Sequence, residues 1–319
     1  MLEKKQEGKA VSQEIRTDLA LEMRERFADD NVEVKGVILD EEFREDGKIR
    51  VSTVVIRDKQ GAEAMKKPEG TYITVEAAEL FAGGETEQRQ AGMEIGRQLK
   101  RLCGQKKIKK LLVAGLGNRE VTPDSLGPLV IDHLLITRHL VREYGEGFLQ
   151  RQLQKELDAE VEVSAVAPGV MAQTGMEALE ILKGIVRETK PDLVLVVDAL
   201  AARSVERLNR TVQLTDTGIC PGAGIGNNRQ AINRESLGCT VIALGVPTVV
   251  DAVTIVMDSM ETFLKTQGYT GREIGIFLSG IETLRSVDTM FVTPKSIDEE
   301  IRDMGRTISE AVNYCFFGI

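Results

Sequence analysis

Short apolar segments alternate with helical segments along the last two thirds of this chain, and this alternation limits the possible folds more than any other feature. The expected strands are residues 110–114, 161–167, 193–197 and 240–245. The expected helices are residues 87–102, 125–141, 174–187, 249–265 and 296–315. Short, mostly apolar strands that alternate with helices are typical of a parallel sheet covered on both faces. We therefore predict an α/β fold with a mostly parallel sheet flanked by helices.

The first quarter of the chain has a different pattern. Residues 1–16 are polar and charged and show no hydrophobic periodicity, which predicts a mobile tail. A helical pattern follows, with Thr17 as its expected N-cap. Alternating apolar and polar residues then predict strands at 32–39, 48–56 and 72–75. We expect them to form a small antiparallel element at about residues 32–76.

Charge and hydropathy exclude several classes of function. The 319 residues include 41 basic and 50 acidic side chains, a net charge of −9, which would repel a phosphate backbone and disfavours direct nucleic-acid binding. No apolar run approaches the roughly 20 residues that span a bilayer, and the N-terminal segment is too charged for a secretory signal. We expect a cytoplasmic protein that does not enter a membrane, with its four cysteines reduced.

The chain contains only two histidines, His133 and His139. On a single helix, their spacing of six residues would turn them about 240° apart, so they could not share a face. Histidine-based triads and histidine-rich metal sites would each depend on one lone imidazole. If the chain is an enzyme, carboxylates are expected to perform the acid–base chemistry, with no metal or other cofactor.

Two aspartates follow expected strands. Asp198 comes directly after the strand at 193–197, and Asp124 lies in the loop after the strand at 110–114. If the strands are neighbours, both side chains face the crevice where parallel strands end. A close carboxylate pair shares one proton, which leaves one base for a water and one acid for a substrate carbonyl. The alternatives are structural: Asp124 as a helix N-cap and Asp198 as a ligand of turn amides.

Two glycine-rich loops resemble phosphate-binding motifs only in part. In the first, Glu120 stands where a dinucleotide fingerprint needs its third glycine, and its charge would oppose a pyrophosphate. The second contains Gly222, Gly224, Gly226 and Asn227 but lacks the Gly-Lys-Ser/Thr ending of a P-loop. We interpret the second loop as flexible or substrate-lining.

Six segments, in this order along the chain, resemble the spore germination protease family. They are residues 115–128, 167–175, 197–203, 215–227, 245–252 and 291–298. The likeness extends from Arg16 to the last helix, and the family is related in fold to the hydrogenase-maturation peptidases. The resemblance implies an aspartic endopeptidase with Asp124 and Asp198 as its catalytic pair. It also implies a homotetramer that degrades small acid-soluble spore proteins in the spore or forespore cytoplasm during germination.

The resemblance further implies a zymogen that removes its own N-terminal segment. Residues 17–20 read Thr-Asp-Leu-Ala, which is similar to the family's substrate pattern of a hydroxyl residue, an acid, a bulky apolar residue and alanine. Cleavage would fall between Asp18 and Leu19. Residues 1–18 would then be a propeptide and residues 19–319 a single α/β protease domain.

Two other functions stay open on the sequence. One is a metal-binding processing peptidase of the hydrogenase-maturation type, in which the equivalent acids would bind nickel; such a site usually includes an imidazole. The other is a non-catalytic ligand-binding module built on the second glycine-rich loop. Replacing either aspartate would abolish peptide cleavage in an aspartic protease, but would leave ligand binding by such a module intact.

Overall fold

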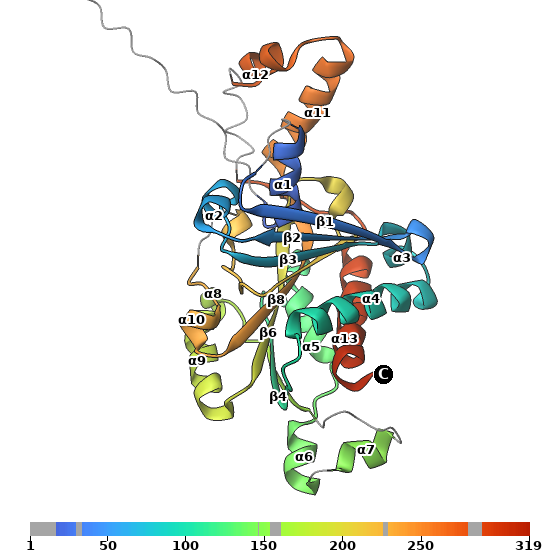
Figure 1. Ribbon diagram of the computed structural model, residues 1–319, viewed down its shortest axis with the longest axis vertical. Coiled ribbons are helices and arrows are strands. Elements are labelled where there is room, and N and C mark those ends of the chain that lie inside the picture. Colours follow the sequence, from blue (N-terminus) through green and yellow to red (C-terminus); the bar gives the residue numbers. More distant parts are fainter. Residues whose placement is uncertain (1–16, 30–33, 146, 154–160, 226–228, 280–288) are drawn as a thin grey trace, which may run out of the picture.

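The computed structural model describes residues 17–29, 34–145, 147–153, 161–225, 229–279 and 289–319 (Figure 1). The strands are β1 (Val37–Arg44), β2 (Ile49–Ile56), β3 (Gly70–Glu76), β4 (Lys110–Gly115), β5 (Glu162–Val166), β6 (Leu193–Ala202), β7 (Thr211–Thr215), β8 (Thr240–Asp251) and β9 (Phe291–Val292). The longer helices are α1 (Ala20–Asp29), α4 (Glu85–Cys103), α9 (Ala178–Thr189), α11 (Ala252–Thr266), α12 (Gly271–Ser279) and α13 (Ile297–Phe317). The short helices are α2 (Lys59–Met65), α3 (Ala78–Phe81), α5 (Leu126–Asp132), α6 (Arg138–Tyr144), α7 (Phe148–Leu153), α8 (Met171–Thr174) and α10 (Arg234–Leu237).

All strands of the described part belong to one sheet, in the order β1-β2-β3-β7-β8-β6-β4-β5, with β9 paired to β8. The strands β5, β4, β6 and β8 are parallel, as the alternation predicted. Strands β1 to β3 are antiparallel, as predicted, and they are joined to the parallel strands because β3 pairs with β7 and β7 pairs with β8. The α/β prediction is confirmed, and the sheet is mixed because the antiparallel strands extend it.

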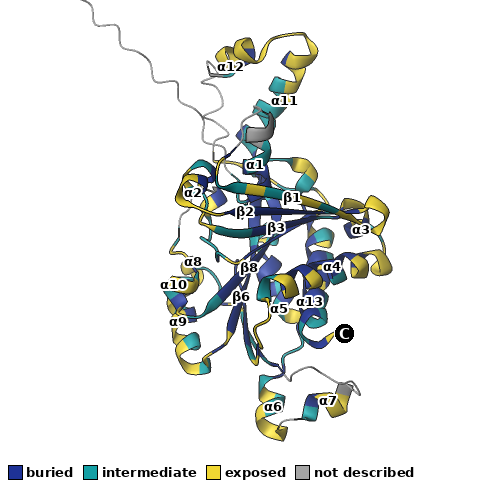
Figure 2. Ribbon diagram, in the orientation of Figure 1, coloured by how far each residue is buried: buried dark blue, intermediate teal, exposed yellow. Residues whose placement is uncertain are grey.

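Helices cover both faces of the sheet (Figure 1). On β4, Val113 packs toward α4, α5 and α13, whereas its neighbour Leu112 packs toward α9 and α10. This follows from the pleat, which sends successive side chains to opposite faces. Figure 2 shows that the central strands are buried along their length. The apolar runs in the sequence predicted this burial. Among the described residues, no helix is long and apolar enough to cross a membrane.

Several predicted boundaries were wrong. The helix expected at 125–141 is two helices, α5 and α6, so His133 lies at the end of one and His139 lies in the other. Helix α1 begins at Ala20, and Thr17 is not its N-cap; its hydroxyl accepts from the Leu19 amide instead. The first strand begins at Val37 rather than at residue 32, and the tail expected at 1–16 lies outside the described residues.

The central strands differ in length, and this difference makes room for a site. Strand β4 ends at Gly115, opposite Val197 of β6, whereas β6 continues to Ala202 and β8 to Asp251. The expectation that the strand ends at residue 197, directly before Asp198, was therefore wrong. It lies within β6, one residue beyond the end of β4, because β6 stays paired with β8.

Candidate active site

Asp198 is buried, with 6% of its surface exposed, and it continues the row of side chains formed by Val194 and Val196 on the α9 face of the sheet. Its Oδ1 accepts from the Ala199 amide at 2.9 Å. The pKa of Asp198 is raised well above the ordinary 3.8, first by burial, then by the charge of Asp124 and then by that of Asp18. Asp198 is therefore poised to hold a proton.

Asp124 reaches the same place from the loop that leaves β4. It ends a short 3-10 turn, Thr122–Asp124, and its Oδ2 accepts from the Asn118 amide at 2.8 Å. Thr248 of β8 donates to the Pro123 carbonyl at 2.7 Å and fixes the loop to the sheet. Burial raises the pKa of Asp124, and the Asn118 hydrogen bond opposes that shift.

Gly117 allows this loop to close tightly. Its φ is +109°, and a Cβ atom there would lie 1.9 Å from the Asp124 carbonyl oxygen. A side chain at this position would displace Asp124. Gly117 is therefore needed to close the loop. This role requires no bound dinucleotide, in agreement with the sequence analysis.

Asp124 and Asp198 line one cavity of about 450 Å³ at the end of β4. Asp18 also lines it, with residues of β6 and β8, the α8–α9 region and the loop after β7. The sequence analysis expected the two aspartates to face one crevice if their strands were neighbours. Strands β4 and β6 are indeed adjacent and parallel. Three carboxyl groups with raised pKa values gather here.

Asp18 is held in the cavity as though it belonged to a bound peptide. Its amide donates to the Ala201 carbonyl, and its Oδ2 accepts from the Ala201 amide, both at 2.9 Å. Its own carbonyl oxygen accepts from Lys67 Nζ at 2.9 Å and from Gln213 Nε2 at 3.1 Å. Burial is the main cause of its raised pKa, while the charge of Lys67 lowers it.

The neighbours of Asp18 are equally well held. Leu19 is fully buried in an apolar cluster with Leu200, Leu208 and Val250. Ala20 is also fully buried and donates its amide to Gln213 Oε1 at 2.7 Å. Residues 18–20 are therefore firmly anchored in the folded chain.

The second glycine-rich loop approaches the same site. Gly222 lines the cavity, and Gly224 lies so close to Asp18 that a Cβ on Gly224 would come within 2.2 Å of the carboxylate. Gly226 and Asn227 lie outside the described residues. The described part of the loop therefore faces Asp18, in keeping with a peptide-lining role.

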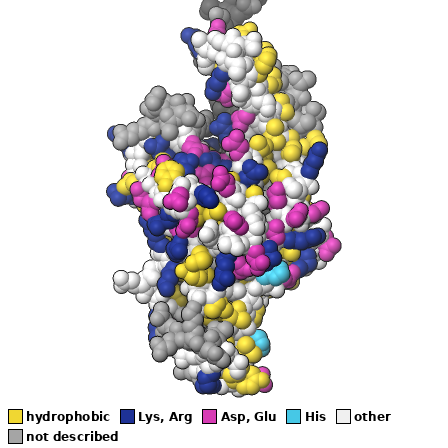
Figure 3. Space-filling view, turned by 90° about the vertical axis from the view of Figure 1, so that its right-hand side faces the viewer, with side chains coloured by type: hydrophobic (Ala, Val, Ile, Leu, Met, Phe, Trp, Pro, Cys, Tyr) yellow, Lys and Arg dark blue, Asp and Glu magenta, His cyan; other side chains and the backbone are white. Residues whose placement is uncertain are grey.

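The histidines are placed elsewhere. His133 and His139 are both exposed and do not line the cavity, and the histidine side chains are visible on the outer face in Figure 3. In the described part of the chain, no group of three or more His, Cys, Asp or Glu side chains is arranged to hold a metal ion. Figure 3 also shows acidic and basic side chains interspersed, without a continuous basic face on this side.

Sequence reasoning missed Lys67 and Gln213. Lys67 stands in a charged stretch that resembles any solvated surface, and Gln213 is one polar residue in an otherwise ordinary strand. Nothing local distinguishes them, because their role depends on strand β7 lying next to β3 and β8.

Known proteins resemble this chain over most of its length. The family model described as "Germination protease" matches residues 13–275. The germination protease of Caldanaerobacter subterraneus subsp. tengcongensis is 42% identical, over 94% of this chain and 93% of its own length. That of Clostridium perfringens strain 13 is 41% identical, over 94% of each chain. That of Bacillus subtilis strain 168 is 43% identical, over 82% of this chain and 69% of its own length.

Among solved structures, the [NiFe] hydrogenase maturation protease HycI from Thermococcus kodakarensis matches with a TM-score of 0.32 and 14% identity, over 68% of this chain and 99% of its own. A similarity this low carries no weight for the chemistry of the site. The family match and the relatives above 40% identity do carry weight, and they agree with the six ordered motifs. The chain belongs to the germination protease family and is a peptidase.

Proposed function

We propose that this chain is an aspartic-type endopeptidase in which Asp124 and Asp198 activate a water molecule. The observation that carries the proposal is the shared cavity, which is lined by Asp198 of β6, by Asp124 of the loop after the adjacent β4, and by Asp18 of the chain's own N-terminal segment. Raised pKa values at both aspartates support a pair that holds one proton between them.

The two environments suggest different roles for the aspartates. Asp198 is more buried, and its pKa is raised by the charge of its partner, so it carries the shared proton. Asp124 is less buried and accepts an amide hydrogen bond, which favours its ionised form. Asp124 would take a proton from water as the water oxygen attacks the carbonyl carbon. Asp198 would then give its proton to the leaving amine as the C–N bond breaks.

Residues 17–20 further suggest a self-processing precursor cut between Asp18 and Leu19. The acid lies against backbone amides, the bulky apolar residue fills an apolar cluster, and the alanine is enclosed without free space. The last three positions of the expected four-residue substrate pattern thus have matching environments. While it occupies the cavity, this segment would exclude other substrates, as a propeptide must.

Further proposals rest on the family resemblance. The substrates would be small acid-soluble spore proteins, cut during germination after a sequence such as Thr-Glu. The protein would act as a homotetramer in the forespore or spore cytoplasm, with residues 1–18 as propeptide and 19–319 as one protease domain. No cofactor is proposed, and no membrane or direct nucleic-acid partner.

A peptide containing Thr-Glu-Ile-Ala tests this function. The acid-treated wild-type protein should cleave the peptide after glutamate, with and without a strong chelator. Asp124→Asn and Asp198→Asn should each lose at least about 10³-fold in rate, because an amide can act neither as base nor as acid. Asp132→Asn is the matched control, since Asp132 is an exposed aspartate of the same region whose carboxylate pairs with Arg119.

Each alternative gives a different result. Loss of activity with chelator and rescue by one divalent ion would indicate the metal-binding processing peptidase. Binding of a ligand that survives both aspartate substitutions, in a protein without peptidase activity, would indicate a binding module. Near-normal turnover of a well-folded Asp198→Asn protein would exclude the aspartate pair.

A further inference from the structure

Two side chains donate to the backbone carbonyl oxygen of a residue that lines the cavity with the aspartate pair. The acceptor is the backbone oxygen of Asp18, the residue before the proposed cut. The donors are Lys67 Nζ at 2.9 Å and Gln213 Nε2 at 3.1 Å. Neither donor belongs to the parallel strands that carry the aspartates: Lys67 follows α2, and Gln213 lies in β7.

Gln213 spans the bond to be cut. Its Oε1 accepts from the Ala20 amide at 2.7 Å, and its Nε2 donates to the Asp18 carbonyl. One side-chain amide thus holds the backbone on both sides of the Asp18–Leu19 peptide bond. Because Oε1 is committed to a donor, Nε2 is directed at the carbonyl oxygen.

Lys67 brings a positive charge to the same oxygen. Burial lowers the pKa of Lys67, while the charges of Asp18 and Glu22 raise it. Burial outweighs these two charges, so the pKa of Lys67 lies below its ordinary value. The acidic conditions in which the proposed cut occurs favour the ammonium form. A cation in such a site interacts strongly with any negative charge that develops on its acceptor, because little water screens it.

Resting on the proposed function, we propose that Lys67 and Gln213 form the oxyanion site of this protease. When the water oxygen bonds to the Asp18 carbonyl carbon, the C=O π electrons move onto the oxygen, and both donors stabilise the resulting oxyanion. When the C–N bond breaks, the carbonyl re-forms and the Leu19 nitrogen takes its proton from Asp198. The aspartates then transfer the protons, while Lys67 and Gln213 stabilise the negative charge on the carbonyl oxygen.

The same pair would act on other substrates, since a peptide in the cavity would present its carbonyl as Asp18 does. The catalytic centre is then composite. The parallel strands supply the acid and base, and the antiparallel extension of the sheet supplies the oxyanion site. This assigns a chemical purpose to the junction between β3, β7 and β8.

The full-length chain tests this inference. After acidification, the loss of the full-length species is followed by mass spectrometry for wild type, Lys67→Met and Asp198→Asn. Lys67→Met should slow the cut by about 10²- to 10³-fold, the effect of removing one oxyanion donor. Lys66→Met is the matched control, because it removes the same charge from the adjacent, exposed position.

Hydrogen exchange at neutral pH shows whether Lys67 polarises the Asp18 carbonyl or only holds residues 17–25 in place. Lys67→Met should leave the amides of residues 17–25 as protected as in wild type, so that only the chemical step is slowed. If Lys67→Met does not fold, Gln213→Glu serves as the second variant. It keeps an acceptor for Ala20 but puts a carboxyl group at the oxyanion, and it should slow the cut at least about tenfold.

Two results would overturn the inference while leaving the aspartate pair in place. One is a Lys67→Met or Gln213→Glu protein that shortens at the wild-type rate while Asp198→Asn stays intact. The other is slow cleavage accompanied by lost protection of residues 17–25, which would make Lys67 only an anchor. If Asp198→Asn shortens like wild type, the proposed function itself fails, and the oxyanion site falls with it.

Discussion

At the scale of single residues, Gly117 tests whether the placement of Asp124 matters. Gly117→Ala adds a Cβ that would clash with the Asp124 carbonyl at 1.9 Å, so the loop must shift. We expect peptide cleavage to fall about 10²-fold, since a displacement of about 1 Å can have that effect. The assay is the cleavage rate of the Thr-Glu-Ile-Ala peptide by the acid-treated protein.

Gly104→Ala is the control for Gly117→Ala. Gly104 also has a positive φ, +63°, but a Cβ there meets nothing within 4 Å. Both variants therefore bear the backbone strain of an alanine in the left-handed region, and only one moves Asp124. Equal losses of activity in the two variants would contradict the proposed placement.

Asp198 gives a prediction about stability and pH. Its folded-state pKa is raised well above the unfolded 3.8, so the native state binds more protons than the unfolded state between these two values. Stability therefore falls as pH rises through that window. Asp198→Asn removes the ionisable group, so the variant should be more stable than wild type at about pH 8, and its advantage should shrink toward about pH 4.

Urea unfolding at several pH values measures this effect. The Asp132→Asn control should change in the opposite sense, because the Arg119 hydrogen bond lowers the pKa of Asp132. An Asp198→Asn protein that is less stable than wild type at every pH would show that Asp198 is ionised and paired in the native state.

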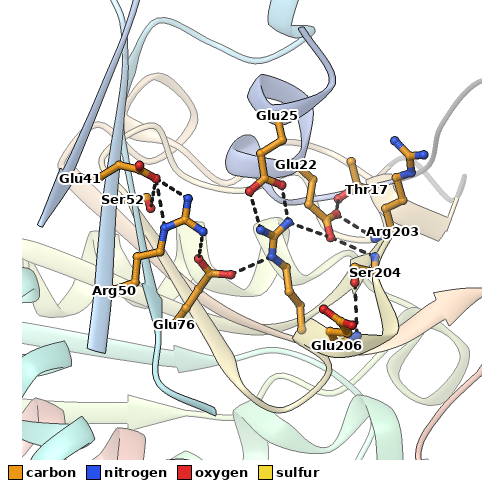
Figure 4. Close-up of polar contacts among 11 residues, drawn as sticks. Thr17, Glu22, Glu25, Glu41, Arg50, Ser52, Glu76, Arg203, Ser204 and Glu206 are labelled. Atoms are coloured by element: carbon orange, nitrogen blue, oxygen red, sulfur yellow. Dashed lines mark hydrogen bonds and ion pairs between the residues drawn. The ribbon is translucent and has the colours of Figure 1, made fainter. Parts of the chain in front are cut away.

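At the scale of elements, α1 is held on the sheet by acidic side chains. Figure 4 shows Glu22 and Glu25 of α1 directed toward one arginine, with Glu76 of β3 on its other side. That arginine is Arg207, which lies 2.7 Å from Glu25 and 2.9 Å from Glu76. Glu22 also accepts from the Arg203 and Ser204 amides, at 2.8 and 3.0 Å. These contacts fix α1 against the sheet, and with it the preceding segment, whose Asp18 lines the cavity.

Arg207→Met should loosen α1. The Arg207 side chain is only 12% exposed, and its removal takes away the guanidinium that lies 3.4 Å from Glu22, whose side chain is 3% exposed. We expect the unfolding free energy to fall by about 3 kcal/mol, as when one member of a buried ion pair is removed. Urea denaturation measures the change.

Arg306→Met provides the comparison, because Arg306 pairs at the surface with Asp303 at 3.2 Å. Its loss should lower the unfolding free energy by less than about 1 kcal/mol. Similar losses in both arginine variants would mean that the cluster around Arg207 does not anchor α1.

At the scale of the whole molecule, the precursor should process itself when acidified. The pKa values of Asp18, Asp124 and Asp198 are all raised, so lowering the pH from neutral adds protons to this group before ordinary carboxylates are affected. Protonation supplies the catalytic proton and weakens the repulsion among the three carboxylates. We expect wild type to shorten to a species that begins at Leu19, as determined by mass spectrometry.

Asp198→Asn protein should stay full length under the same conditions. A new N-terminus at any residue other than Leu19, or equal shortening of the variant in a protease-free preparation, would refute self-processing at this bond.

Much of the fold could be predicted because it depends on local pattern. The runs at 111–114 and 193–197 are apolar throughout, which is typical of strands buried on both faces. The lengths of β6 and β8 could not be predicted in the same way. Asp198 and the residues after it continue β6 only because β8 lies alongside to pair with them.

The candidate site also has a part that the sequence could predict and a part that it could not. The sequence by itself determined that carboxylates after strands, rather than histidines, were the available acid–base groups, and the ordered motifs pointed to Asp124 and Asp198. Only the tertiary structure decided that Asp18 lies beside them and that Lys67 and Gln213 hold its carbonyl. The physical reason is distance along the chain: Lys67 and Gln213 meet Asp18 through pairing between β3, β7 and β8, and such pairing leaves no periodic trace in any local window of sequence.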